Sequence, residues 1–124
     1  MDFSIDAALQ ADHDRLRAFV RDEIVPLEAD RKNYDSYGNI DMAVLQTLRA
    51  KVKAAGLWAP QIPREQGGLG YEPTGMAVLY EAMNYSIFGP VAFNCAAPDD
   101  GNMYILNKVA NQAQKDRWLT PIIN

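Results

Sequence analysis

Cysteine and histidine are nearly absent from this sequence of 124 residues, which contains one of each, Cys95 and His13. A single cysteine excludes an intrachain disulfide and fits a reducing compartment. Zinc sites take three or four ligands, mostly from histidine, cysteine and carboxylate side chains. Because one histidine and one cysteine far apart in the sequence do not supply such a set, we expect no metal site.

Long apolar runs, basic clusters and a secretion signal are missing as well. No segment approaches the roughly 18 consecutive apolar residues of a transmembrane helix, and the first residues, MDFSIDAALQADHDR, lack the basic and apolar regions of a signal peptide. The formal net charge is -4, from 16 acidic and 12 basic residues, without the basic run that binds a phosphate backbone. We therefore expect a cytoplasmic protein with no membrane span and no nucleic-acid partner.

The composition that is present is typical of one globular domain. Hydrophobic residues make up 48% of the sequence and charged residues 23%, which are ordinary values for a folded protein. A chain of this length normally builds a single core. No repeat, low-complexity tract or convincing strand pattern occurs, so we expect residues 1–124 to form one helical domain.

The first predicted helix extends from about Asp6 to Arg31. Its apolar residues recur three, four and seven positions apart, which places them in one stripe. The stripe consists of Leu9, Leu16, Phe19, Val20, Ile24 and Leu27. Pro26 lacks a backbone donor and clashes with the preceding turn, which predicts a kink or break near Val25.

A second helix is predicted from Asp41, which is a good N-cap, to Ala55, with Gly56 at the position after the C-cap. The residues that follow, LWAPQIPREQGGLGYEP, contain three prolines and three glycines and indicate a structured loop.

The glycines of this loop are Gly67, Gly68 and Gly70. We interpret them as a tight turn in which at least one has positive φ, with Gly68 as first choice. The alternative is a loop that contacts a ligand, although phosphate-binding glycine loops follow a strand and this one follows a helix.

A third helix is predicted from Pro73 or Thr74, with Thr74 as its cap, to about Ser86. Its apolar face contains Met76, Leu79, Tyr80 and Met83. A Pro-Asp-Asp-Gly breaker at 98–101 then precedes an apolar stripe formed by Met103, Leu106 and Val109.

Asn111 and Gln114 have the spacing of a capping box. They predict a last helix from Gln112 to about Leu119 that turns Trp118 and Leu119 inward, and Trp58 should also be at least partly buried. Together the segments predict an all-α bundle of about five helices with a Pro/Gly-rich loop after the second helix.

The polar residues that could carry chemistry have simpler interpretations. His13 lies between two aspartates on the first helix, and we expect it at the solvent boundary. Cys95 would need an activating base to act as a nucleophile, so we expect a small buried hydrophobe. Asp99 and Asp100 are expected to cap a helix. Spacing alone predicts no catalytic site.

Four segments resemble the N-terminal helical domain of acyl-CoA dehydrogenases, in the order in which that family has them. They are VRDEIVPLEADR, LWAPQIPREQGGLGY, the helix with VLYEAMNYS, and NQAQKDRWLTPIIN. A further stretch, FGPVAFNCAAPDDGNM, is similar to a branch of large, multi-domain or oligomeric members. The resemblance covers nearly the whole sequence.

The resemblance implies that this chain is one part of a larger enzyme of fatty acid metabolism. Family members add a middle β-domain and a C-terminal four-helix bundle, hold FAD mainly between those two domains, and carry the catalytic glutamate in the C-terminal domain. It therefore implies an acyl-CoA substrate and a homo-oligomer when complete, with no catalytic residue in this chain and no FAD held by it alone. The apolar end TPIIN also suggests a truncated sequence.

In relatives, the helix pair equivalent to about 91–106 borders the far end of the acyl pocket. The resemblance thus implies pocket-lining roles for Val91, Ala92, Phe93, Asn94, Ala96, Ala97 and Asn102. Asn94, Asp99 and Asn102 depart from a purely apolar lining, which argues against a simple medium-chain substrate. The alternative is that these polar groups cap a helix at Asp100 and never meet a ligand.

Other functions stay open at this point. The chain could be a stand-alone, non-catalytic helical interaction module, or the matching domain of an acyl-CoA oxidase or nitroalkane oxidase. The reading frame beyond Asn124 separates these possibilities, since a β-rich continuation favours the enzyme and a stop codon favours the module.

Overall fold

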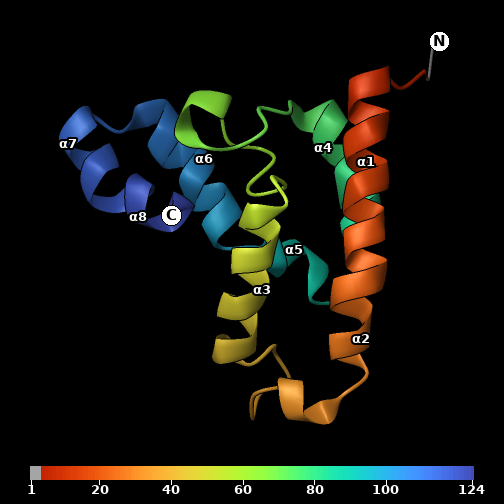
Figure 1. Cartoon of the computed structure of the whole chain (residues 1–124). Helices are drawn as coiled ribbons and strands as arrows, with labels where there is room; N and C mark the ends of the chain where they lie inside the picture. Colours follow the sequence, from red (N-terminus) through yellow and green to blue (C-terminus); the bar gives the residue numbers. More distant parts are fainter. Residues whose placement is uncertain (1–3) are drawn as a thin grey trace.

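The computed structural model describes residues 4–124, which fold mainly into helices (Figure 1). The α-helices are α1 (Ala7–Phe19), α2 (Val25–Glu28), α3 (Met42–Ala54), α4 (Pro73–Met83), α5 (Gly89–Ala92), α6 (Asp99–Val109), α7 (Gln112–Gln114) and α8 (Thr120–Ile123). Shorter π or 3₁₀ segments are η1 (Val20–Ile24), η2 (Arg31–Asn33), η3 (Arg64–Gln66) and η4 (Lys115–Leu119). Within residues 4–124 the only extended pairing is an isolated bridge between Tyr34 and Ile40. The all-α prediction is confirmed.

The first helix begins where the sequence predicts and becomes π-helical in the turn before Pro26. The Asp6 side chain accepts hydrogen bonds from the backbone N–H groups of Ala8 and Leu9, at 3.0 and 2.9 Å. Further along, the backbone N–H of Val25 donates to the carbonyl of Val20, five residues earlier. Because Pro26 cannot donate to the ladder, the irregularity takes the form of the π-helical segment η1 in the turn before it.

The second and third helices differ in how they begin. Asp41 caps α3 as predicted, since its carboxylate accepts from the N–H groups of Ala43 and Val44, and Gly56 has a φ of 67°. α4 begins at Pro73, one of the two predicted starts. The prediction that Thr74 caps it is wrong: Pro73 takes the first position and the helix has no side-chain cap, because proline needs no partner for a backbone donor there.

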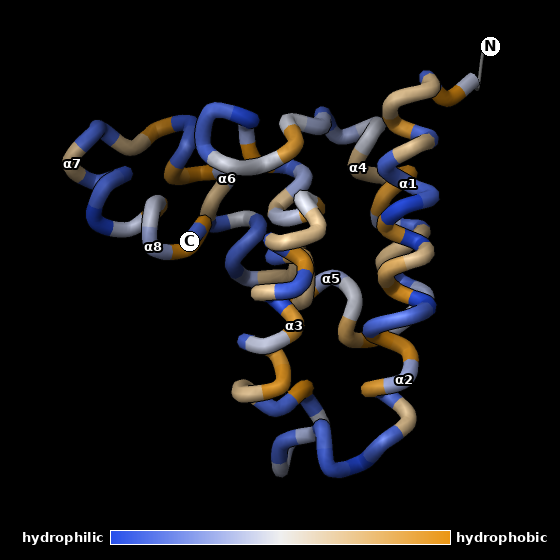
Figure 2. Tube along the Cα trace, in the orientation of Figure 1, coloured by the Kyte–Doolittle hydropathy of each residue, from blue (hydrophilic) through white to orange (hydrophobic). Residues whose placement is uncertain are grey.

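The packed helices form two groups joined through the middle of the molecule. α1 lies against α4 along its length, while α6 packs against η4 and α8 on the opposite side (Figure 1). Between them, α3 packs on α5. Apolar and polar residues alternate along α1 (Figure 2), and its inward stripe of Leu9, Leu16, Val20 and Ile24 is buried. No helix within residues 4–124 is long and apolar enough to cross a membrane.

The region around α6 departs from the sequence prediction in two ways. The Pro-Asp-Asp-Gly segment does not lie wholly outside the helix that follows it. α6 starts at Asp99, directly after Pro98, so three of the four residues are helical. Asp99 and Asp100 lie inside the first turn, where a negative charge is favourable, rather than capping it. Val109 is 77% exposed, so the apolar stripe of α6 continues from buried Met103 only to half-buried Leu106.

The last helical region confirms its predicted start and corrects one predicted side chain. Asn111 and Gln114 form the capping box, with bonds of 3.0 and 2.9 Å. Leu119 is buried but Trp118 is 46% exposed, so its inward orientation was predicted wrongly. Neighbouring helical residues point in different directions, and the buried face follows Leu119 and Ile123.

Candidate functional site

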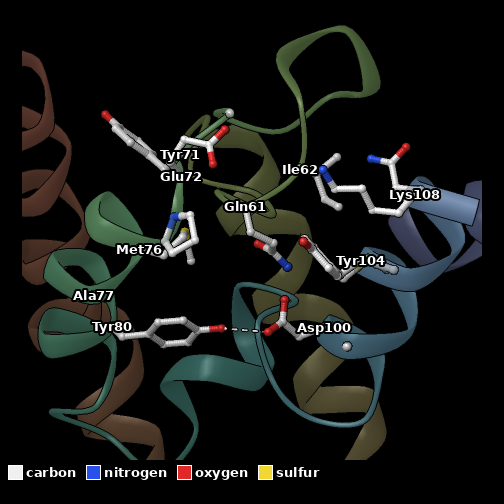
Figure 3. Close-up of a pocket in the computed structure, with 15 residues that line it drawn as sticks. Gln61, Ile62, Tyr71, Glu72, Met76, Ala77, Tyr80, Asp100, Tyr104 and Lys108 are labelled. Carbon is white, nitrogen blue, oxygen red and sulfur yellow. Dashed lines mark hydrogen bonds between the residues drawn. The ribbon is translucent and has the colours of Figure 1, made fainter.

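A groove of about 760 Å³ separates α4 from α6 (Figure 3). From α4 it is lined by Pro73, Met76, Ala77 and Tyr80, and from α6 by Asp100, Gly101, Met103, Tyr104, Asn107 and Lys108. Each set recurs at intervals of three and four residues, so each is one face of its helix. The groove is therefore formed by two helix faces that oppose each other.

The two helices run in opposite directions along the groove. Tyr80 near the end of α4 meets Asp100 at the start of α6, with 3.2 Å between the Tyr80 hydroxyl and Asp100 Oδ2. Tyr80 lies seven positions after Pro73 on α4, which at the helical rise corresponds to about 10 Å of groove. The apolar lining comprises exposed Ala77 together with Ile62, Met76 and Met103, which also belong to the buried core.

The loop between α3 and α4 closes one side of the groove with Gln61, Ile62, Gly70, Tyr71 and Glu72. Its glycines have the backbone that the sequence predicts, although not at the residue of first choice. Gly67 and Gly70 have φ values of 93° and 73°. Gly68 has no positive φ; instead, a Cβ there would lie 2.0 Å from the carbonyl oxygen of Ile62.

Two side-chain contacts attach this loop to the helices on either side. The amides of Gln66 and Asn107 exchange hydrogen bonds of 3.1 and 3.3 Å, which join the loop to α6. The Tyr71 hydroxyl donates to Asp12 Oδ2 on α1 at 2.8 Å. Burial, together with the bond to Asp12 and its negative charge, raises the pKa of Tyr71 to about 12, so the phenol stays protonated at neutral pH.

The end of the groove at Tyr80 is closed by hydrogen bonds to the turn after α5. The Tyr80 hydroxyl lies 2.9 Å from the carbonyl oxygen of Cys95, and Gln61 Nε2 donates to the carbonyl of Asn94 at 2.8 Å. The Cys95 thiol donates to Gln61 Oε1 at 3.1 Å. Burial raises the pKa of both Tyr80 and Cys95. Both groups are thus neutral, and Cys95 is the buried small residue that the sequence predicts.

The seven residues given pocket-lining roles by the resemblance do not line this groove. Their burial divides them into three sets: Ala92, Phe93 and Asn94 are buried, Val91 and Ala96 are half-buried, and Ala97 and Asn102 are exposed. The Phe93 ring meets Phe19 at 5.8 Å between centroids. Asn94 has a φ of 61° and donates to the carbonyl of Ile122 at 2.9 Å, which is a structural contact.

Sequence reasoning missed Met76, Tyr80 and Met103 as groove residues. Their helical spacing was correctly read as apolar, but it was interpreted as core packing alone. The sequence also contains a sign of the groove on α6, where the polar residues Asp100 and Asn107 lie seven positions apart on the same helix face as Met103. A stripe that mixes apolar and polar groups in this way is typical of a ligand cavity.

His13 occupies a different place from the one predicted. It is 8% exposed, between α1 and α4, rather than at the solvent boundary. Its Nδ1 lies 3.2 Å from Asp14 Oδ1 and its Nε2 lies 3.9 Å from Glu81 Oε2. It belongs to the packing of these helices and not to the groove. Residues 4–124 contain no cluster of three or more His, Cys, Asp or Glu side chains able to hold a metal ion.

Comparison with known proteins shows which family the region that contains the groove resembles. Residues 7–124 match the family model described as "Acyl-CoA dehydrogenase, N-terminal domain". Mouse acyl-CoA dehydrogenase family member 10 is 32% identical over 118 residues, covering 90% of this chain and 11% of the mouse protein. The Mycobacterium tuberculosis protein named probable acyl-CoA dehydrogenase FadE2 is 34% identical over 134 residues, covering 100% of this chain and 31% of that protein.

The architecture is also similar to that of a solved structure. A Mycobacterium abscessus protein, provisionally assigned as an acyl-CoA dehydrogenase, matches with a TM-score of 0.81 and 32% identity. The match covers 98% of this chain and 32% of that one. The chain therefore spans between about a tenth and a third of the length of these relatives.

Proposed function

This chain belongs to the acyl-CoA dehydrogenase family, and we propose that it is the N-terminal domain of a flavin-dependent enzyme that oxidises an acyl-CoA thioester to its α,β-unsaturated product. In this proposal the groove between α4 and α6 is one wall of the acyl pocket. The observation that carries the proposal is a groove of about 760 Å³ between two facing helices, which lies within the region matched by the family model.

The chemistry of the groove suits an aliphatic chain. Ala77 exposes apolar surface in the groove, and the buried side chains of Met76 and Met103 also line it. Apolar ligands bind by removing such surface from water. Methionine side chains adapt their shape to a flexible partner. The role of these residues is therefore to bind the acyl chain, to fix its direction and to exclude water around it.

The polar groups at the Tyr80 end of the groove are already engaged and do not suit a flavin ring. Flavin rings need hydrogen-bond partners at their nitrogens, whereas the Gln61 amide and the Tyr80 hydroxyl are already bonded to backbone carbonyls. If held by the other domains of the complete enzyme, FAD would supply the acceptor for the hydride that leaves Cβ of the substrate. We assign the FAD contacts and the general base that removes the α-proton to the other domains, and none of them to residues 4–124.

A chimera tests the proposal directly. This chain would replace the equivalent segment of the Mycobacterium tuberculosis relative, whose matched region covers all of it. We expect the chimera to bind FAD and to reduce an artificial electron acceptor when acyl-CoA is added. Ala77→Trp, which fills the groove from an exposed helix position, should lower kcat/KM by roughly tenfold or more, as misplaced methylene groups do.

Ala50→Trp is the matched control, because Ala50 is an exposed alanine on α3 outside the groove. It should leave kcat/KM unchanged. The proposal would be contradicted by a chimera that binds FAD but does not oxidise any of the acyl-CoA substrates that the unmodified relative oxidises. An Ala77→Trp chimera as active as the Ala50→Trp chimera would show that the groove is not the acyl wall.

A further inference from the structure

We propose that Tyr80 is the residue that limits acyl chain length, as the closed end of the groove between α4 and α6. The inference rests on the proposed function and adds a specificity-determining residue to it. Tyr80 extends from α4 across the end of the groove toward Asp100 on α6 (Figure 3). A chain that lies along Met76 and Ala77 would meet the Tyr80 ring, because these residues share one face of α4.

The hydroxyl of Tyr80 has two acceptors within reach. It lies 2.9 Å from the carbonyl oxygen of Cys95 and 3.2 Å from Asp100 Oδ2. A phenol has one hydrogen to donate and both partners are acceptors, so the hydroxyl donates to one of them at a time, with the Cys95 carbonyl the nearer. The two acceptors belong to the turn after α5 and to α6, and either bond keeps the ring across the end of the groove.

Gln61 makes the same end of the groove rigid. Its Nε2 donates to the carbonyl of Asn94, and its Oε1 accepts from the Cys95 thiol. Asn94 and Cys95 are both buried. If an incoming chain displaced Tyr80 or Gln61, a buried carbonyl would lose its partner, which is unfavourable. The ring therefore resists displacement, and longer chains gain no further apolar contact.

The opposite end of the groove has no comparable closure. Glu72 and Lys108 border it, and both are exposed. Only the end at Tyr80 combines a bulky ring with hydrogen bonds to buried backbone. Chain length should thus be limited at Tyr80 and at no other lining residue.

The experiment measures how affinity depends on chain length. The 124-residue chain would be titrated with S-acyl-N-acetylcysteamine thioesters from butyryl to palmitoyl, which present the acyl thioester without the nucleotide. For the wild type we expect Kd to fall by roughly fourfold for each added methylene, the value of burying one such group, until the chain reaches Tyr80. Beyond that length Kd should stay level or rise.

Tyr80→Ala and Tyr80→Leu should each move this break to longer chains, with roughly fourfold gains per added methylene continuing past the wild-type limit. Tyr80→Leu keeps an apolar side chain on α4 and decides the question if the alanine variant does not fold. Tyr37→Ala is the control, because Tyr37 is 89% exposed in a loop away from the groove. Its curve should match that of the wild type.

Failure of the limit at Tyr80 can be distinguished from failure of the acyl wall. A break that stays at the same length in the folded Tyr80 variants overturns the role of Tyr80 and leaves the acyl wall intact. An equal loss of affinity at every length identifies a structural role only and also overturns it. If the wild type shows no dependence on chain length, both the limit at Tyr80 and the acyl wall are wrong.

Discussion

Glycines in the loop between α3 and α4 serve two different needs. Gly67 and Gly70 adopt left-handed backbone, with φ values of 93° and 73°, which other residues adopt only with strain. Gly68 is required because the backbone approaches closely: the carbonyl oxygens of Ile62 and Ala59 lie 2.0 and 2.5 Å from the position of a Cβ. The loop can therefore fold back onto itself beside the groove only if residue 68 has no side chain.

Gly68→Ala should destabilise the chain by about 1–3 kcal/mol, the usual cost of forcing extra volume into a packed site. The control is Gly101→Ala in α6, where a Cβ meets nothing within 4 Å. That variant should be stabilised by about 0.5–1 kcal/mol, since alanine is the better helix former. Urea unfolding of both variants checks the pair. Equal stability of Gly68→Ala and wild type would contradict the close approach.

Tyr71 predicts a pH dependence at alkaline pH. Its pKa is about 12 in the folded chain, against an ordinary value of 10. A raised pKa means that the folded state keeps the proton more firmly, so the stabilisation is complete below pH 10 and is lost as pH rises toward 12. In Tyr71→Phe this contribution should be absent. The stability difference between wild type and Tyr71→Phe, measured from pH 8 to pH 11, should shrink as pH rises, and a constant difference would contradict the assignment.

Among the elements, α8 shows how distant side chains complete a helix end. The last carbonyls of a helix have no partners within it. In α8, the carbonyl of Ile123 accepts from Trp58 Nε1 at 2.6 Å and that of Ile122 accepts from Asn94 Nδ2 at 2.9 Å. Lys53 also donates to the carbonyl of Asn124. The C-terminal helix is thus fixed to α3 and to the turns around it.

The two tryptophans should respond differently to the same change. Trp58→Phe removes the donor to a buried helix end and should cost about 1–3 kcal/mol. Trp118→Phe alters a side chain that is 46% exposed and should stay within about 0.5 kcal/mol of wild type. Thermal or urea unfolding measures both. A larger loss of unfolding free energy for Trp118→Phe than for Trp58→Phe would contradict the account, because it would mean that Trp118 is on the buried face of η4.

At the scale of the whole molecule, local signals predicted helices well and the groove poorly. Asp41, Gly56 and the Asn111–Gln114 capping box act within a few residues of their own positions, so their roles could be inferred from spacing. The groove joins α4, α6 and the loop at 60–72, which only long-range packing brings together. The bond from Asn94 to the carbonyl of Ile122 could not be predicted for the same reason, because the two residues are 28 positions apart.

Helical periodicity also has a limit that this fold exposes. A face turned toward the core and a face turned toward a cavity have the same spacing of apolar residues. Met83 and Met76 are therefore predicted alike, and both are buried, at 0% and 6% exposed, but only Met76 also lines the groove. Separating the two requires knowing which helices stand opposite, and the sequence pattern does not contain that information.

The central claim is that an acyl chain binds between α4 and α6, and methionine methyl groups report on it most directly. Met76 and Met103 line the groove, whereas Met42 is exposed on α3 and Met83 is buried in the core. With ¹³C-methyl methionine and S-octanoyl-N-acetylcysteamine as ligand, NMR should show saturable shifts at Met76 and Met103 while Met42 and Met83 stay unchanged. Shifts confined to Met42 or Met83, or no shift at any of the four at millimolar ligand, would contradict the claim.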